Sequence, residues 1–374
     1  MFWWFYIIAV LLIVPYILWI GWFYYGWVKT ATWSSRTDYE KPGISVIIAA
    51  RDEEENISGL LRSLARQNYP RNLLDVIIID DNSSDLTHEI ASQFINKHIN
   101  FRYLKLPEGL HGKKAAIRLG VSYARFSSIL LTDADCRVSA EWVGTIADCL
   151  VHSGADLIAG PVLLNGDESL LSKFQQLEHI SLQGSAAGAI RTGNPVMCSS
   201  ANLAFKKEAY LEADDPARDK ISSGDDVFLL LTLHKKGRKI IFLKSADACA
   251  ESRVRGSLKG FFEQRGRWAS KSLYYNTKAS LFTAILVFTV NFLLLAFMIA
   301  GFFIPGFLLL AALMWIGKSL VDFPFLYSIT GYFRKRRLMF YFPLMQILYP
   351  FYVNYTAVAS FSGDIYWKGR KVGK

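Results

Sequence analysis

Hydrophobic residues form two long blocks in this chain. Residues 2–28 contain no charged side chain, and a second apolar block fills most of residues 281–333. A helix needs about 20 apolar residues to cross the hydrocarbon core of a bilayer. The first block also lacks the basic leader and small-residue cleavage site of a signal peptide. The pattern therefore predicts a retained transmembrane anchor over residues 1–28. A Pro-Gly pair at 305–306 divides the second block into two potential spans.

The last apolar segment, residues 338–361, is less uniform because it contains prolines, a glutamine and an asparagine. Such a segment can span the membrane, re-enter it or lie at its interface. The C-terminal membrane region, residues 280–374 with its basic tail, is therefore expected to contain two or three transmembrane or interfacial helices.

Between the two blocks, short apolar runs alternate with amphipathic helical patterns. This alternation predicts an α/β domain over residues 29–256, with a mostly parallel sheet and helices on both faces. Ligands of such sheets bind beyond the carboxyl ends of the strands. A basic, aromatic, amphipathic helix is expected to follow within residues 257–279. The predicted strands or extended stretches cover residues 44–50, 75–80, 101–106, 127–132, 156–162, 196–205 and 239–243. The predicted helices of the domain cover residues 54–67, 85–96, 113–124, 170–190 and 224–236.

Positive charge gathers beside the predicted membrane segments. The formal net charge is +10, and much of the excess lies in Arg334-Lys-Arg-Arg337 and in the tail 368–374. Short cytoplasmic loops of membrane proteins carry such an excess of Lys and Arg. The distribution argues against a nucleic-acid partner. It predicts a bacterial-type inner (plasma) membrane protein with an outside N-terminus and its α/β domain in the cytoplasm. The cysteines show no paired spacing, which fits a reducing compartment without a zinc site or disulfide framework.

Acidic residues follow the predicted strands at their carboxyl ends. Asp133 and Asp135 end one strand, and Asp80 and Asp81 end another. Each cluster by itself could be a helix cap or a solvated turn. Two carboxylates so close in sequence stay ionised at low cost only beside a cation. Mg²⁺ and Mn²⁺ take oxygen ligands and share them between one or two carboxylates and substrate phosphates. The pattern predicts such a metal at Asp133 and Asp135.

Short polar motifs occur in a fixed order over residues 44–275. In order, the motifs are Ala50-Arg-Asp-Glu-Glu54, Asp80-Asp-Asn-Ser-Ser-Asp85, Gly112-Lys113 with Ala115-Ala116, Thr132-Asp-Ala-Asp135, Gly224-Asp-Asp226 and Gln264-Arg-Gly-Arg-Trp268. They resemble the motifs of family 2 glycosyltransferases, which are membrane-linked enzymes with a GT-A fold. The resemblance is to the branch with ceramide glucosyltransferase and cellulose and hyaluronan synthases in particular. The last motif is the most specific, since it matches the family's Gln-x-x-Arg-Trp pattern.

The resemblance implies a nucleotide-sugar site at the acidic clusters. Asp81, with Asp80 and Glu53 nearby, would bind the nucleobase and ribose of the donor, most often UDP. A carboxylate can accept hydrogen bonds from the uracil N–H or the ribose hydroxyls. Asp133 and Asp135 would hold Mg²⁺ or Mn²⁺, with Asp135 the direct ligand, and the ion would neutralise the diphosphate leaving group.

The resemblance also implies a catalytic base. Asp226 would take the proton from an acceptor hydroxyl as its oxygen attacks the anomeric carbon, which inverts the sugar's configuration. Glutamate is common at the position of Asp225, whose expected role is orienting. Lys113 admits two interpretations, a charge near the phosphates or an ordinary surface lysine at a helix start.

The Gln-x-x-Arg-Trp motif is expected to shape the acceptor site and hold the diphosphate. Gln264, Arg265, Arg267 and Trp268 suit this role because guanidinium groups bind phosphate in a fork and an indole offers a flat face. The same residues also suit an interfacial helix with its Arg, Lys and Trp at headgroup level. Both interpretations can hold together, since a lipid acceptor would arrive from that interface.

These observations predict a metal-dependent, inverting hexosyltransferase that moves a sugar from a nucleotide-diphosphate sugar to a membrane lipid hydroxyl. A processive polysaccharide synthase is the alternative within the family, although such enzymes usually carry more spans after the Gln-x-x-Arg-Trp motif. A catalytically inactive membrane scaffold is the alternative outside it. A P-loop phosphotransferase is excluded because His111-Gly-Lys-Lys-Ala lacks the upstream glycine and the hydroxyl after lysine that bind phosphate and Mg²⁺ in that motif.

Overall fold

The computed structural model divides the chain into two compact units. The sheet unit comprises Thr30–Asn165, Met197–Arg253 and Tyr366–Lys374, and the helical unit comprises Met1–Lys29, Gly166–Val196 and Val254–Ile365. The structure describes residues 3–36, 38–213, 224–272, 274–275, 277–361, 365–367 and 370–372. Part of the predicted basic tail, residues 368–369 and 373–374, lies outside the described residues.

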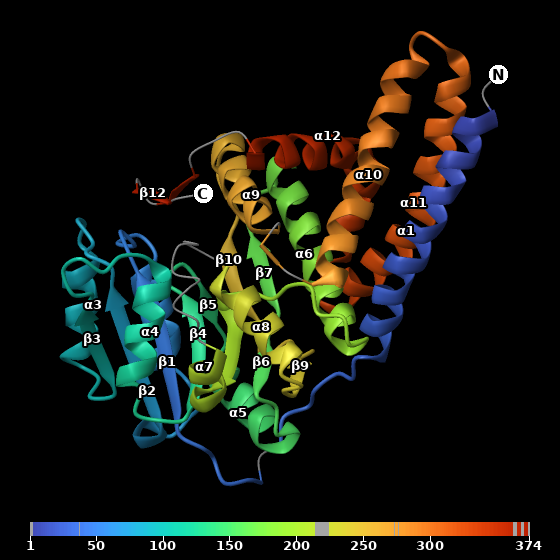
Figure 1. The fold of residues 1–374 in the computed structure, drawn as a ribbon. Coiled ribbons are helices and arrows are strands. Elements are labelled where there is room, and N and C mark those ends of the chain that lie inside the picture. The colour runs from blue at the N-terminus through green and yellow to red at the C-terminus, as the bar shows by residue number, and fades with distance from the viewer. Residues whose placement is uncertain are drawn as a thin grey trace. The chain divides into compact units, whose positions relative to one another are not determined.

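The sheet unit is built on a seven-stranded sheet with the order β3-β2-β1-β4-β8-β6-β9 (Figure 1). Only β8 runs antiparallel to its neighbours, β4 and β6. The remaining pairs are parallel, as the strand-helix alternation predicted. The strands are β1 (Ile44–Ala50), β2 (Leu74–Asp80), β3 (Phe101–Lys105), β4 (Ser128–Asp133), β6 (Leu157–Ala159), β8 (Leu203–Lys206) and β9 (Ile240–Phe242).

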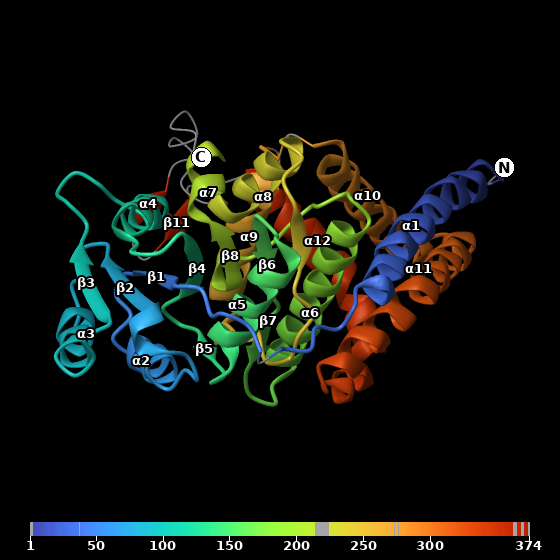
Figure 2. The same cartoon turned by 90° about the horizontal axis from the view of Figure 1, so that it is seen from below.

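Helices cover both faces of this sheet. Figure 2 shows α4 on one face and α2 and α3 on the other. The central strands β1 and β2 are mostly apolar, and every residue of β2 is buried, as expected for a sheet covered on both sides. The helices of this unit are α2 (Ile57–Ala65), α3 (Thr87–Ile95), α4 (Lys113–Tyr123), α5 (Trp142–Ser153), α7 (Lys207–Ala213) and α8 (Asp225–Lys235), with 3₁₀ turns η1 (Arg71–Leu73) and η2 (Ser200–Asn202).

The strand predicted over residues 156–162 is divided in the structure. It ends as β6 at Ala159 and resumes as β7 (Val162–Asn165) in a second sheet of order β5-β10-β7, with β5 (Arg137–Val138) and β10 (Ala250–Arg253). The break has a physical reason. Pro161 has no N–H to donate to a ladder, and a Cβ at Gly160 would lie 2.4 Å from the Asn202 side chain. Helix α5 and strand β10 are absent from the sequence-based prediction.

The helical unit holds the apolar segments. Three of its described helices are long and apolar enough to cross a membrane, over Ile7–Lys29, Lys278–Gly301 and Pro305–Tyr332. Pro305 stands at the start of the third, so the predicted break is confirmed. The helices are α1 (Trp3–Lys29), α6 (Leu170–Arg191), α9 (Leu258–Ser272), α10 (Lys278–Gly301), α11 (Pro305–Tyr332) and α12 (Phe342–Phe361), with the 3₁₀ turn η4 (Arg336–Tyr341). Two short strands, β11 (Ile365–Trp367) and β12 (Arg370–Val372), follow.

Helix α6 belongs to the helical unit, whereas the sequence predicted one α/β domain over residues 29–256. The physical reason is a close backbone crossing between α1 and α6. A Cβ at Gly26 would lie 2.3 Å from the carbonyl oxygen of Gly188, and a Cβ at Gly188 would lie 2.0 Å from that of Phe23. Facing glycines let two helix backbones approach this closely.

Helix α12 forms from the segment whose placement the sequence left open. Figure 1 draws it across the direction of α10 and α11. It is not among the described helices that are long and apolar enough to span a membrane. Its orientation within the helical unit favours the interfacial alternative over a third C-terminal span.

Candidate active site

The acidic clusters converge at one edge of the sheet because β1 lies between β2 and β4. In the parallel register Ala50 pairs with Asp80, and Ala49 pairs with Asp133. The carboxyl ends of these strands therefore meet at the same edge, which is where an open α/β sheet binds its ligands. The structure thus brings together Asp80, Asp81 and Asp133, as the sequence predicted.

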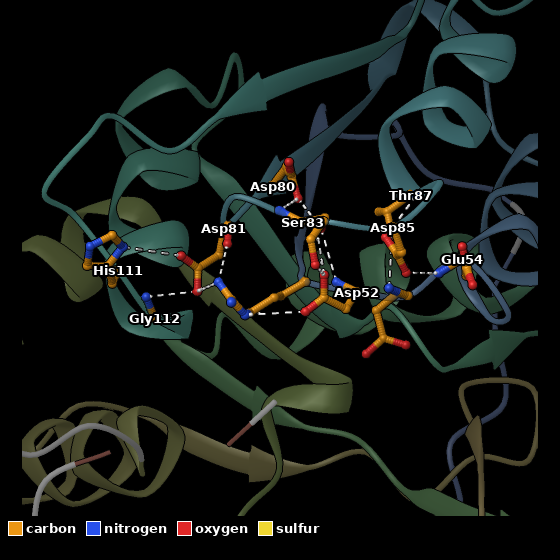
Figure 3. A network of polar contacts seen from close by, with 12 residues as sticks. Asp52, Glu54, Asp80, Asp81, Ser83, Asp85, Thr87, His111 and Gly112 are labelled. Carbon is orange, nitrogen blue, oxygen red and sulfur yellow. Dashed lines mark hydrogen bonds and ion pairs between the residues drawn. The ribbon is translucent and has the colours of Figure 1, made fainter. Parts of the chain in front are cut away.

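Two loops at this edge are joined by reciprocal hydrogen bonds (Figure 3). Asp52 accepts from the Ser84 N–H at 2.8 Å and donates its own N–H to Ser83 Oγ at 3.0 Å. Both Asp52 and Asn82 adopt positive φ values, 48° and 53°, which L residues adopt rarely and at a cost. The network holds the β1 and β2 loops in one fixed conformation.

Asp81 is buried at this edge with cationic and backbone neighbours. Its Oδ2 accepts from the Gly112 N–H at 3.0 Å. Arg51 donates to the Asp81 carbonyl at 2.7 Å, and His111 Nδ1 lies 3.9 Å from its Oδ1. Gly112 has a φ of 92°, so a side chain at this position would strain the turn that delivers its N–H.

Asp80 and Glu53 have internal partners. The Asp80 carboxylate accepts from the Ser83 N–H at 3.1 Å and from the Tyr103 hydroxyl at 2.7 Å. Burial, and then the bond to Asp80, raise the pKa of Tyr103. Glu53 Oε2 accepts from the Asn56 amide at 2.8 Å. Their predicted contacts with substrate stay predictions.

A chain of polar contacts runs from Asp133 to Asp226. Lys113 Nζ pairs with Asp133 and donates to Ser200 Oγ at 2.8 Å. The Ser200 N–H in turn donates to Asp226 Oδ2 at 2.9 Å. Burial lowers the pKa of Lys113, but the charge of Asp133, its hydrogen bond and the charges of Asp226 and Asp225 outweigh this and raise it. Lys113 is therefore a cation held between the two acidic clusters.

Asp225 and Asp226 occupy the first turn of α8. Gly224 forms the N-cap with a φ of 93°. Carboxylates are stabilised at this end of a helix by the macrodipole, so a structural reason for these two exists alongside the predicted catalytic one. Burial and then the charge of Asp226 raise the pKa of the nearby Cys198 thiol well above its ordinary value, so this thiol stays protonated.

The donor set at Asp133 and Asp135 fits a hard divalent cation. Asp133 is partly exposed. Burial, followed by the charges of Asp135 and Asp133, raises the pKa of Cys136 well above its usual range. No group of three His, Cys, Asp or Glu side chains is arranged for a metal in the described part of the chain. Two carboxylate groups completed by diphosphate oxygens and water suit Mg²⁺ or Mn²⁺.

The Gln264-Arg-Gly-Arg-Trp268 motif lies on α9 in the helical unit. Within that unit Arg265 is 2% exposed and pairs with Glu178 at 2.6 Å. Trp268 is 38% exposed. The roles predicted for Gln264 and Arg267 in substrate binding stay predictions, as do those of Arg265 and Trp268.

Sequence reasoning missed Ser200 and Glu178. The sequence predicted an extended stretch around Ser200, where neither periodicity nor charge distinguishes this residue, and the structure places it at the start of the turn η2. Glu178 could have been found, because it follows Phe174 by four residues on the apolar face of a predicted helix, where a carboxylate needs a partner.

Comparison with known proteins agrees with the motifs. Residues 45–212 match the model of the family described as Glycosyl transferase family 2. Residues 45–212 therefore resemble a family 2 glycosyltransferase domain. A mannosyltransferase from Pyrobaculum calidifontis, solved with GDP-Man and Mn²⁺, shares the fold with a TM-score of 0.61, covering 95% of this chain and 98% of that one at 16% identity.

Several curated relatives share this glycosyltransferase domain. The chain is 27% identical over 225 residues to Glycosyltransferase AglE of Haloferax volcanii, which is 58% of this chain and 69% of that protein. It is 28% identical over 266 residues to a poly-beta-1,6-N-acetyl-D-glucosamine synthase of Staphylococcus epidermidis, covering 68% of this chain and 61% of that protein. A beta-monoglucosyldiacylglycerol synthase of Trichormus variabilis is 32% identical over 139 residues, 37% of this chain and 30% of that protein.

Proposed function

We propose that this protein is an inverting glycosyltransferase that moves a hexose from a nucleotide-diphosphate sugar, with UDP as the nucleotide, to a hydroxyl of a membrane lipid. The observation that carries the proposal is the polar chain from Asp133 through Lys113 and Ser200 to Asp226. It links a carboxylate suited to the diphosphate end of the donor with a carboxylate suited to the acceptor proton.

In this proposal each residue of the sheet edge has one task. Asp81 binds the nucleoside, and Lys113 lies against the diphosphate as a positive charge. Asp226 accepts the proton of the acceptor hydroxyl, whose oxygen bonds to the anomeric carbon while the bond from that carbon to the diphosphate breaks. Asp133 and Asp135 would hold Mg²⁺ or Mn²⁺, which when bound stabilises the charge of the departing nucleoside diphosphate.

The lipid acceptor is supported by the helical unit. Three described helices are long and apolar enough to span a membrane, and we propose that the catalytic domain faces the cytoplasm of an integral inner-membrane protein. The beta-monoglucosyldiacylglycerol synthase among the relatives is named for a glycolipid product. A hydroxyl in the headgroup region would reach such an enzyme without leaving the membrane.

A processive polysaccharide synthase is the second candidate. It is favoured by the similarity to the poly-beta-1,6-N-acetyl-D-glucosamine synthase over 68% of this chain. The two candidates differ in product, since one sugar on a lipid is extractable in organic solvent and a high polymer is not.

The deciding experiment supplies membranes containing the purified protein with radiolabelled nucleotide sugars, UDP-sugars first and GDP-sugars second. A labelled lipid in the organic phase supports the proposal. A labelled polymer in the aqueous phase replaces it with the synthase, and no transfer from any donor removes the enzymatic function. EDTA is expected to stop the reaction and Mn²⁺ or Mg²⁺ to restore it; transfer that survives EDTA would remove the metal from the proposal.

A further inference from the structure

Glu178 joins three helices of the helical unit at one buried carboxylate. It lies on α6, is 6% exposed and uses both of its oxygens. Oε2 accepts from Arg265 Nη2 of α9 at 2.6 Å, and Oε1 accepts from the Tyr352 hydroxyl of α12 at 3.0 Å. A single side chain therefore fixes α9 and α12 on α6.

Arg265, which Glu178 holds in place, contacts other residues of the Gln264-Arg-Gly-Arg-Trp268 motif. Its Nη1 donates to Gln264 Oε1 at 3.0 Å. Its guanidinium lies over the Trp268 ring, 4.1 Å from the ring centre, and 5.1 Å from that of Phe261. Two residues expected to meet the substrates, Gln264 and Trp268, thus take their orientation from a guanidinium held by Glu178.

The energetics of the Arg265–Glu178 ion pair favour a role in orienting its neighbours over a role in stabilising the fold. Burial lowers the pKa of Arg265, but the charges and hydrogen bonds of Glu178 and Tyr352 outweigh it and raise the pKa, so the guanidinium stays charged. Well-packed apolar side chains of similar volume usually stabilise a protein as well as a buried ion pair does, or better. A bidentate or stacked guanidinium instead supplies fixed directions.

We propose that Glu178 is a positioning residue for the transfer reaction. Through Arg265 it holds Gln264 and Trp268 of the Gln-x-x-Arg-Trp motif in the orientation that receives the acceptor. The inference rests on the proposed function, because it assumes that this motif serves glycosyl transfer. It assigns Arg265 to the support of the motif and leaves direct contact with substrate to Gln264, Arg267 and Trp268.

The first test compares Glu178→Gln with Glu168→Gln in the full-length protein. Glu168 pairs with Lys173 but its side chain is 88% exposed, so it is a matched control that removes a charge near the start of the same helix. For Glu178→Gln we expect kcat/KM for the acceptor to fall about 10²-fold, the order expected when a reacting group is misplaced by about 1 Å. Donor affinity, measured by nucleotide titration, and slow hydrolysis of the nucleotide sugar are expected to stay as in the Glu168→Gln control.

The second test separates positioning from stability. Glu178→Gln leaves a buried guanidinium without its anion, which itself destabilises a protein. The double variant Glu178→Gln/Arg265→Met removes both charges and is expected to regain thermal stability while acceptor transfer stays low. Tyr352→Phe keeps the ion pair and deletes one hydrogen bond, so its loss of transfer is expected to be smaller than that of Glu178→Gln.

Two results would overturn the inference. One is wild-type acceptor kinetics in Glu178→Gln, and the other is a double variant that regains transfer together with its stability, since a merely structural pair would behave so. Failure of the proposed function has a different signature. In that case the wild-type protein itself transfers no sugar, whereas the inference fails only in a protein whose wild type is active.

Discussion

The two units treat their charges in opposite ways. At the edge of the sheet, Lys113 and Asp133 pair with side chains that are 26% and 34% exposed. In the helical unit, Lys318 and Asp322 pair with side chains that are 2% and 12% exposed. The pair at the sheet edge is open to exchange of partners with a substrate and solvent. The pair on α11 is closed, because both of its side chains are almost fully buried.

The closed pair is fully supplied with protein partners. Lys318 Nζ donates to Gln346 Oε1 at 2.7 Å, and Gln346 donates to Asp322 Oδ2 at 2.9 Å. The Tyr16 hydroxyl donates to Asp322 Oδ1 at 3.0 Å. Charges inside apolar helices persist only when paired in this way. The difference teaches that charge at the sheet edge stays accessible, as the proposed reaction requires, while the charges of α11 are used in contacts with α1 and α12.

The largest expected effect comes from the open edge. Asp226→Asn removes the proposed base but keeps an acceptor oxygen for the Ser200 N–H. Transfer is expected to fall about 10³-fold, within the usual contribution of general base catalysis, while nucleotide binding and thermal stability stay unchanged. Steady-state transfer assays and nucleotide titration on the same preparation measure both. Retained turnover would remove Asp226 from the base role.

The second largest effect is expected at the buried Lys318–Asp322 pair, and it concerns unfolding free energy. Lys318→Met leaves Asp322 with its charge unpaired and is expected to cost about 3 kcal/mol of unfolding free energy. The double variant Lys318→Met/Asp322→Asn removes both charges, keeps an acceptor for Tyr16, and is expected to recover most of that loss. Thermal unfolding in detergent provides the measurement. A single variant as stable as the wild type would show that this pair is not closed.

Lys113→Met tests the open pair directly. Because both side chains of the Lys113–Asp133 pair are partly exposed, unfolding free energy is expected to change by less than about 1 kcal/mol. Transfer is expected to fall about 10²-fold, as when one preorganised electrostatic contact to a developing charge is removed. A stability loss as large as that of Lys318→Met, with normal transfer, would erase the contrast between the two units.

The smallest expected effect on unfolding free energy comes from the Asp156–Lys206 pair of the sheet unit. This pair serves as the baseline for the other two pairs. Asp156 accepts from Lys206 at 2.9 Å and from the Lys239 N–H at 3.0 Å. Burial raises its pKa, but these bonds outweigh burial and hold it below its usual range. The pair therefore stabilises the folded state at neutral pH, and this contribution is lost as pH falls through the lowered pKa. Lys206→Met is expected to cost less than about 1 kcal/mol at pH 7, with the difference narrowing below about pH 4 in pH-dependent unfolding.

Local sequence patterns predicted the helices and strands but not which of them pack together. The runs at 44–50 and 75–80 were recognisable as strands because a parallel strand that is buried on both faces is a nearly continuous apolar run, which is visible in any short window. The division of the 156–162 strand depended on Asn202, which lies against Gly160 from a distant part of the chain. Helix α6 had a clear local period, yet its place against α1 depended on one glycine from each helix.

Sequence alone determined the apolar spans, the strand-helix alternation, the order of the motifs and the acidic residues at strand ends. Each of these features depends only on residues that are close together in the sequence. Only the tertiary structure decided that Lys113 meets Ser200 and that Arg265 meets Glu178, partners that are 87 residues apart in both cases. A charge in a sequence can find its counterion anywhere in the chain. Which counterion it takes, and whether water reaches the pair, follows from packing. Here packing leaves the Lys113–Asp133 pair of the proposed reaction site partly exposed and buries the Arg265–Glu178 pair between α9 and α6.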